Sequence, residues 1–428
     1  MLGWIVVIIL LAAGLGSVGV DRWLRRRSRN LLHLTRGGWQ MEMQEVDHYR
    51  WRGHLEWVNP SFRFEVMIPE CTVKVQLLSR HDLTGITVKT ELISHHPDAP
   101  TRPDGYWLSC IIKTRQRVGL EVILDITGAD LSGLQSAWVQ IHYVTYGPAG
   151  WLPRQQHIVL PLAFPDPTRT IVSRRTPNQA EILLIRTHLL CHLDDPVAVI
   201  KRYAQPHALP GDIVVFGETP VAIMQGRWRH PQQIQPGWLA RRLCTFFLPT
   251  SSLATACGLQ SLIDLVGWPR VLGAFLGGAV AKLAGKPGVF YQLAGEQAAL
   301  IDDVTGTLPP YDRFVVLGPT RPQTVVNEIK EQTGLAAAIV DVNDLKAVRI
   351  LAVTPDVDRE LLTRVLVDNP AGNADEQTPL LLIRPLPPEP DTPAEAIVEP
   401  VTDYGDDPTA PPPRMEDDFD PHGGWRPG

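Results

Sequence analysis

The feature that most limits the fold of this chain is a series of short segments in its amino-terminal half. Between residues 38 and 165, eight segments alternate apolar with polar side chains, and Pro, Gly and Asp turns separate them. Their spacing of roughly ten residues is typical of strands in an all-β sandwich or a small barrel. The histidines of this region are scattered, with no catalytic constellation. We therefore predict a β-sandwich module over 38–165 that acts in interactions.

The chain is long enough for more than one hydrophobic core. With 428 residues, it is expected to form about two to three domains. Residues 166–179 contain Pro and several Arg residues and are predicted to be a linker. From 180 to 385, apolar strand-like runs alternate with amphipathic helices, which indicates a mixed α/β domain. The predicted fold class is α+β multidomain.

Several elements of the 180–385 region can be placed from their patterns. Helices are expected at 195–205, 321–334 and 356–370, and strands at 181–190, 211–227 (with a turn at 218–220), 335–345, 347–354 and 378–385. The run from 253 to 283 is apolar and rich in Gly. Its longest uncharged piece after Arg270 has eleven residues, too few to span a bilayer. We expect buried helices there, and a helix lying in a membrane interface is the alternative.

The amino terminus has the composition of a membrane anchor. Residues 2–20 carry no charge and are mostly apolar, about the length that crosses a bilayer as a helix. Five Arg residues follow within 22–29, and positive charge on this side predicts that the bulk of the chain is cytoplasmic. We predict a single-pass transmembrane anchor at 1–21 and a basic juxtamembrane segment at 22–37. A buried amino-terminal helix is the alternative.

The carboxyl terminus is acidic and rich in Pro. Residues 386–428 hold eleven acids and two bases, while the whole chain has a net charge of −6. With few apolar positions, this tail is predicted to be disordered, and its charge suits a basic protein partner or simple solvation. We expect no nucleic-acid partner. The five cysteines are odd in number and widely spaced, which favours a reducing compartment over a disulfide framework.

Motifs in the second half of the chain resemble those of a known enzyme family. In IRTHLLCHLDDPVAVIKRYAQPHALPGDIVVFGETPVAIMQGR, a strand, an Asp-Asp-Pro helix start, a Gly-Asp strand and a polar turn ending in Gly-Arg follow one another. AGEQAALIDDVTGTLPPYDRFVVLGPTRPQTVVNEIK and the acidic segment IVDVNDL come later. In order and spacing, these motifs resemble the coenzyme F(420)-0:γ-glutamyl ligase family over about residues 180–385. This chain would be a divergent, membrane-anchored member.

The resemblance implies a mixed α/β fold, usually dimeric, that uses GTP and a divalent metal, Mg²⁺ or Mn²⁺, to join a carboxylate to the amino group of glutamate. By position, it places metal carboxylates in two segments, Asp302 with its neighbour Asp303, and Asp341 or Asp344. Residues assigned to nucleotide binding are Gly211, Asp212, Thr219 and Arg227. Because Mg²⁺ prefers oxygen ligands and needs only one or two protein carboxylates beside phosphate, these residue types suit the chemistry.

The metal candidates and Arg227 also have a purely structural interpretation. Asp302 and Asp303 lie in IDDVTGTLPPYD, which has the composition of a polar turn. The Asp341–Asp344 segment ends an apolar strand and would serve equally as a helix or turn cap, and Arg227 would pair with a structural carboxylate.

A further candidate is the polar segment 368–379. Its side chains Asn369, Asn373 and Gln377 are candidates for a loop ordered over a ligand, or for a solvated connector.

The sequence therefore predicts a membrane-anchored γ-glutamyl ligase-like protein with metal- and GTP-dependent amide ligation. The alternative is a catalytically inactive scaffold or interaction protein at the membrane, whose sandwich and tail bind protein partners.

Overall fold

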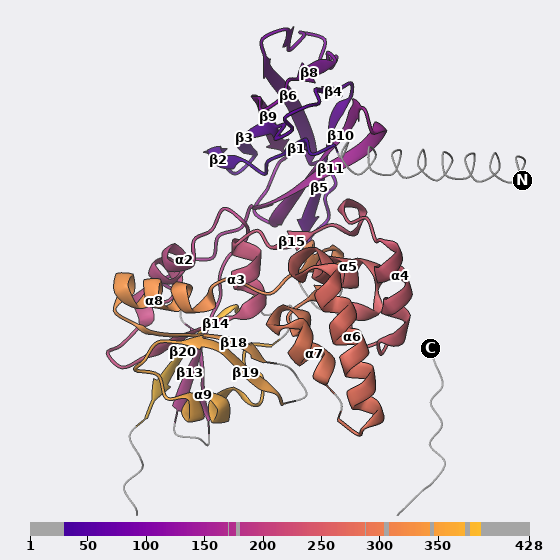
Figure 1. The fold of residues 1–428 in the computed structure, drawn as a ribbon. Coiled ribbons are helices and arrows are strands. Elements are labelled where there is room, and N and C mark those ends of the chain that lie inside the picture. Colours follow the sequence, from indigo (N-terminus) through magenta and orange to yellow (C-terminus); the bar gives the residue numbers. More distant parts are fainter. Residues whose placement is uncertain are drawn as a thin grey trace, which may run out of the picture. The chain divides into compact units, whose positions relative to one another are not determined.

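The computed structural model has an all-β region followed by a mixed α/β region, in agreement with the predicted fold class (Figure 1). It describes residues 30–169, 171–176, 180–286, 288–303, 308–342, 346–372 and 377–386. The predicted anchor at 1–21, residues 22–29 of the basic segment and the acidic tail beyond Leu386 lie outside the described residues.

The all-β region consists of two antiparallel sheets. The first has the order β1-β3-β9-β6-β7, with β2 also paired to β3. Its strands are β1 (His33–Leu34), β2 (Gly38–Gln44), β3 (His48–Val58), β6 (Thr87–His96), β7 (Ala99–Pro100) and β9 (Arg117–Thr127). The second has the order β11-β10-β4-β8, with β5 also paired to β10. Its strands are β4 (Val66–Ile68), β5 (Cys71–Ser79), β8 (Cys110–Ile112), β10 (Leu134–Gly147) and β11 (Gly150–Pro161).

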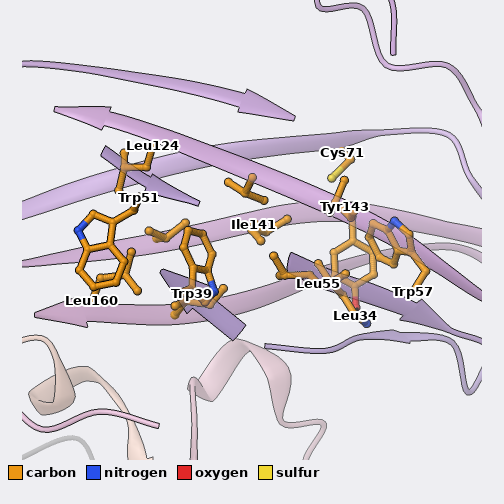
Figure 2. Close-up of a cluster of buried hydrophobic side chains, with 14 of the residues drawn as sticks. Leu34, Trp39, Trp51, Leu55, Trp57, Cys71, Leu124, Ile141, Tyr143 and Leu160 are labelled. Atoms are coloured by element: carbon orange, nitrogen blue, oxygen red, sulfur yellow. Dashed lines mark hydrogen bonds between the residues drawn. The ribbon is translucent and has the colours of Figure 1, made fainter. Parts of the chain in front are cut away.

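Alternating side chains of these strands form one core between the sheets. Along β3, the side chains of Trp51, Leu55 and Trp57 are buried, and their neighbours in sequence are more exposed. Figure 2 shows these residues with Tyr143, whose ring meets Trp57 edge-on at 4.6 Å. Because β1 pairs with β3, the first sheet begins before residue 38, the predicted start of the module.

The α/β region is built on a six-stranded sheet in the order β12-β13-β20-β14-β18-β19. The strands are β12 (Val172–Thr176), β13 (Ala180–Ile185), β14 (Ile213–Gly217), β18 (Ala336–Val342), β19 (Val348–Val353) and β20 (Leu380–Pro385). Only β14 and β18 run parallel to each other among these pairs. The edge strand β12 lies inside the segment predicted as a linker, and its exposed Arg174 and Arg175 are typical of an edge that discourages further pairing.

Helices cover both faces of this sheet (Figure 1). On one face lie α2 (Pro196–Tyr203), α3 (Glu218–Met224) and α8 (Pro322–Thr333). The other face is covered by α9 (Arg359–Leu366). Asp195 caps α2 by accepting from the Ala198 amide, and Asp358 caps α9 by accepting from the Glu360 amide.

One element differs from the prediction. Residues 218–224 were expected to turn and continue as a strand, whereas they form the helix α3. Its four consecutive residues from Val221 to Met224 are all buried, so their sequence has no helical alternation of apolar and polar positions. A short apolar run of this kind reads equally well as a buried strand.

The remaining residues form a helical segment and a small sheet. The helices are α4 (Trp238–Leu243), α5 (Ala256–Val266), α6 (Trp268–Leu283) and α7 (Val289–Ala294), and the sheet consists of β15 (Trp228–Arg229), β17 (Val315–Val316) and β16 (Asp302–Asp303) in this order. Among the described residues, no single helix has the length and apolarity of a membrane span. α5 and α6 have this length and apolarity only when they are taken together, across a bend of 115°.

The sandwich packs directly against the rest of the chain. Trp138 and Val159 of the sandwich share an apolar cluster with Trp228 and Phe314. Beside it, the Arg36 guanidinium lies 3.8 Å from the centre of the Trp228 ring and donates to the carbonyl oxygens of Gly226 and Trp228 at 2.6 and 2.7 Å. A partly buried cation that donates to two carbonyls stabilises the contact between the two regions.

Candidate functional site

A cavity of about 610 Å³ lies where β14 and β18 end. Because these strands are parallel, their carboxyl ends meet at one edge of the sheet, where ligands of α/β proteins commonly bind. The volume is within the range of small-molecule sites. Among its lining residues, polar and charged side chains come from five separate segments: Thr187, His188, Glu218, Thr219, Asp302, Asp341, Asn369, Gln377 and Thr378.

Three carboxyl groups face this cavity. Glu218 follows directly after β14, Asp341 is the last residue but one of β18, and Asp302 belongs to the small sheet. Burial, together with the charges of Asp341 and Asp302, raises the pKa of Glu218 to about 9, and Arg349 opposes this shift. The group is therefore neutral at neutral pH in the absence of a cation.

The two aspartates are perturbed in the same direction. Burial raises the pKa of Asp302, although the Thr219 hydroxyl donates to its Oδ2 at 3.2 Å and counteracts the shift. Burial also raises the pKa of Asp341, with Arg349 on the neighbouring strand opposing it. The charge of Asp341 also raises the pKa of Asp302, and both aspartates raise that of Glu218, so a cation in this cavity would favour the ionised forms.

The donor set suits a hard divalent cation. Glu218 is only 8% exposed, and its Oε2 has no hydrogen-bond partner among the residues that the structure describes. A buried oxygen without a partner costs free energy unless a ligand satisfies it. No group of three or more His, Cys, Asp or Glu side chains in the described ranges has the geometry of a metal site. Mg²⁺ commonly binds through one or two carboxylates plus water and phosphate, so the residues present still fit.

Several of the residues singled out from the sequence come together here. Thr219, Asp302, Asp341, Asn369 and Gln377 all line the cavity, although they are far apart in the chain. Asn369 and Gln377 adopt positive φ angles of 45° and 51°, which side chains other than Gly rarely adopt. Such strained residues cluster at ligand sites in proteins.

Other candidates lie elsewhere. Gly211 and Asp212 precede β14 and thus stand at the opposite end of a five-residue strand, about 16 Å away at the usual rise per residue. Asp212 is buried and accepts from Arg384 at 2.9 and 3.0 Å, which is a structural ion pair. Neither Gly211 nor Asp212 lines the cavity.

Arg227 and Asp303 also have partners outside the cavity. Arg227 donates to the Gly318 carbonyl and to Gln297 Oε1 at 2.9 Å, and it lines a separate hollow of about 400 Å³. Asp303 accepts a hydrogen bond from the Thr255 hydroxyl, just before α5. Two further candidates, Asp344 and Asn373, lie outside the described residues.

Sequence reasoning missed Glu218. It singled out the adjacent Thr219 for nucleotide binding and left Glu218 unassigned. The available signal was position, because an acid that directly follows the apolar run IVVF stands at the carboxyl end of a buried strand.

Comparison with known proteins supports a relation to F(420)-0:γ-glutamyl ligases for one domain of the chain. Residues 33–164 match the family model "F(420)-0:gamma-glutamyl ligase, N-terminal Ig-like domain". The match covers the sandwich, whereas the resemblance noted in the sequence lies in residues 180–385. No curated protein matches the chain.

Three solved structures are similar to about a third of the chain. The GAE domain of GGA2p from Saccharomyces cerevisiae is 9% identical, with 30% of this chain and 97% of that chain covered and a TM-score of 0.19. The yeast GGA1 GAE domain is 13% identical (30% and 91% covered, TM-score 0.18), and a FixG-related protein from Vibrio parahaemolyticus is 10% identical (30% and 94% covered, TM-score 0.16). The family-model match relates this chain, through its Ig-like domain, to F(420)-0:γ-glutamyl ligases.

Proposed function

We propose that this chain is a ligase that forms an amide bond, of the γ-glutamyl type, with the help of a divalent cation and GTP. The observation that carries this proposal is the convergence of Glu218, Asp302 and Asp341 in one cavity at the carboxyl ends of the parallel strands. The Ig-like domain supports it, since the matching family model is that of a γ-glutamyl ligase.

The bound Mg²⁺ or Mn²⁺ would neutralise the charge of the phosphate oxygens while a carboxylate substrate is activated. Asp302 and Asp341 would hold this cation together with water and phosphate oxygens, and the neighbouring Glu218 would lose its proton when the cation binds. Thr219 orients Asp302 through its hydroxyl. Asn369, Gln377 and Thr378 also line the cavity, and their amide and hydroxyl groups would position polar groups of the substrates.

The proposal places the enzyme at a membrane. The apolar segment 2–20 and the Arg residues that follow it would anchor the chain, with the catalytic region in the cytoplasm. A homodimer is expected by analogy with the family, and the acidic tail would recruit a basic protein. The anchor would be refuted if the full-length protein stayed in the high-speed supernatant and substitutions in 2–20 did not change this.

Calorimetric titration of the full-length protein with Mn²⁺ and GTP tests the site. We expect binding heat that Asp302→Asn and Asp341→Asn each reduce at least about tenfold in affinity, because each removes a charged oxygen ligand. Asp303→Asn is the matched control, since it changes the adjacent carboxylate outside the cavity and should leave the affinity unchanged. Repeating the titration in buffers of different ionisation enthalpy should reveal proton release from Glu218.

The outcome also separates the two functions considered from the sequence. An absence of Mn²⁺ and GTP binding in the parent protein would refute the enzyme and favour a scaffold that keeps the ligase-like fold. Equal effects of Asp302→Asn and Asp303→Asn would instead show that the cavity is not where the cation binds.

A further inference from the structure

The helical segment that contains α4 to α7 exposes an unusual amount of apolar surface. Seven large apolar side chains in this segment are between 57% and 90% exposed. They are Trp238, Phe246, Leu248, Trp268, Leu276, Val280 and Leu283. Exposed apolar residues are normal when they are scattered singly, whereas a cluster of this kind marks an interaction surface.

Four of these residues lie on one side of α6. At 100° per residue, Trp268, Leu276, Val280 and Leu283 fall within about 120° of the helix circumference. The buried residues Val271 and Ala274 lie on the other side. The helix is thus apolar on both faces, and a helix that is apolar all round is normally covered by protein or lipid.

The exposed surface extends beyond this helix. The ring of Phe246 meets the ring of Phe275 edge-on at 5.4 Å, which places Phe246 beside the middle of α6. Leu248 follows two residues later. We call the set formed by Phe246, Leu248, Leu276, Val280 and Leu283 the α6 face. Figure 1 shows α4, α5, α6 and α7 packed together in one group.

The segment that carries the α6 face has an excess of basic residues. Residues 236–295 contain five basic residues and one acid. The acid, Asp264, is paired with Arg229 at 2.9 Å and so adds little negative potential. The basic residues Arg241, Arg242, Arg270, Lys282 and Lys286 are all exposed. Apolar side chains with Trp and a positively charged border are typical of segments that lie in the surface of an anionic bilayer.

We propose that the α6 face docks on an anionic lipid bilayer, with α6 lying in the plane of the interface. Leu276, Val280 and Leu283 enter the acyl boundary, and the exposed Arg and Lys side chains contact lipid phosphates. This contact is separate from the amino-terminal anchor and from the carboxylate cavity, so neither of the functions proposed above is needed for it.

The experiment uses the full-length chain with its amino-terminal apolar segment made polar by Val7→Asp, Leu11→Asp and Leu15→Asp. Sedimentation with vesicles of phosphatidylcholine, with and without phosphatidylglycerol, measures binding. We expect the protein to bind the anionic vesicles, and this binding should weaken with added salt. The three substitutions Leu276→Ser, Val280→Ser and Leu283→Ser together should weaken it at least about tenfold.

The matched control carries Val46→Ser, Val172→Ser and Leu209→Ser, which are exposed apolar positions elsewhere in the chain. It should change vesicle binding less than about twofold, and both triple variants should keep the parent's circular dichroism spectrum and thermal midpoint. Equal losses in the two variants, or no vesicle binding by the parent, would overturn the proposal. If the parent bound no vesicles but formed a dimer in ultracentrifugation that the α6-face variant lost, the face would instead bind a second copy of this chain.

Discussion

Replacing Glu218 by Gln should change how stability depends on pH. In the folded protein, the pKa of Glu218 is raised from 4.5 to about 9. Between these values the unfolded chain ionises and the folded chain does not, so the group destabilises the fold as pH rises. The slope is about 1.4 kcal/mol per pH unit, which amounts to a cost of about 3 kcal/mol near pH 7.

The substitution removes this cost because an amide does not titrate. The free energy of unfolding of Glu218→Gln, minus that of the parent, should therefore grow by about 1.4 kcal/mol per pH unit between about pH 5 and pH 8. Urea unfolding of both proteins at several pH values measures the difference, in which titrations common to both cancel. Differences that stay constant with pH would refute the assignment of a neutral, buried Glu218.

A divalent cation provides a second arm of the same experiment. The cation should replace the proton on Glu218 and raise the parent's free energy of unfolding, by an amount that grows with cation concentration. Glu218→Gln should lose most of this increment. If the cation stabilised both proteins equally, it would bind away from the cavity, and the proposed function would lose its main support.

Three other predictions concern stability. Trp57→Ala should cost about 3–5 kcal/mol in urea unfolding, because it empties the sandwich core, whereas Trp151→Ala at a half-exposed site should cost far less. Burial lowers the pKa of His157 to about 3, so stability should fall below about pH 6.5 as the unfolded chain gains a proton, and His157→Asn should reduce this loss in acid unfolding. Arg36→Ala should cost about 1–3 kcal/mol by leaving two carbonyls without a donor, measured by thermal unfolding against Arg36→Lys.

The strands of the sandwich could be predicted because their burial alternates. Eight predicted segments match β3, β4, β5, β6, β8, β9, β10 and β11, although several begin or end a few residues away. The short strands β1 and β12 carry no such pattern. β1 forms by pairing with the end of β3, and β12 forms by pairing with the adjacent strand β13. α3 was missed for a related reason, since all of its residues from Val221 to Met224 are buried.

The pair Asp302–Asp303 shows why a site is harder to predict than a strand. Both residues looked equivalent in the sequence, yet side chains of consecutive strand residues point to opposite faces. Pairing with Val316 and Val315 directs Asp302 to the cavity and Asp303 to Thr255. The choice between ligand site and polar turn therefore has a different answer for each residue. What decides it is the position of β17, which no local pattern around Asp302 specifies.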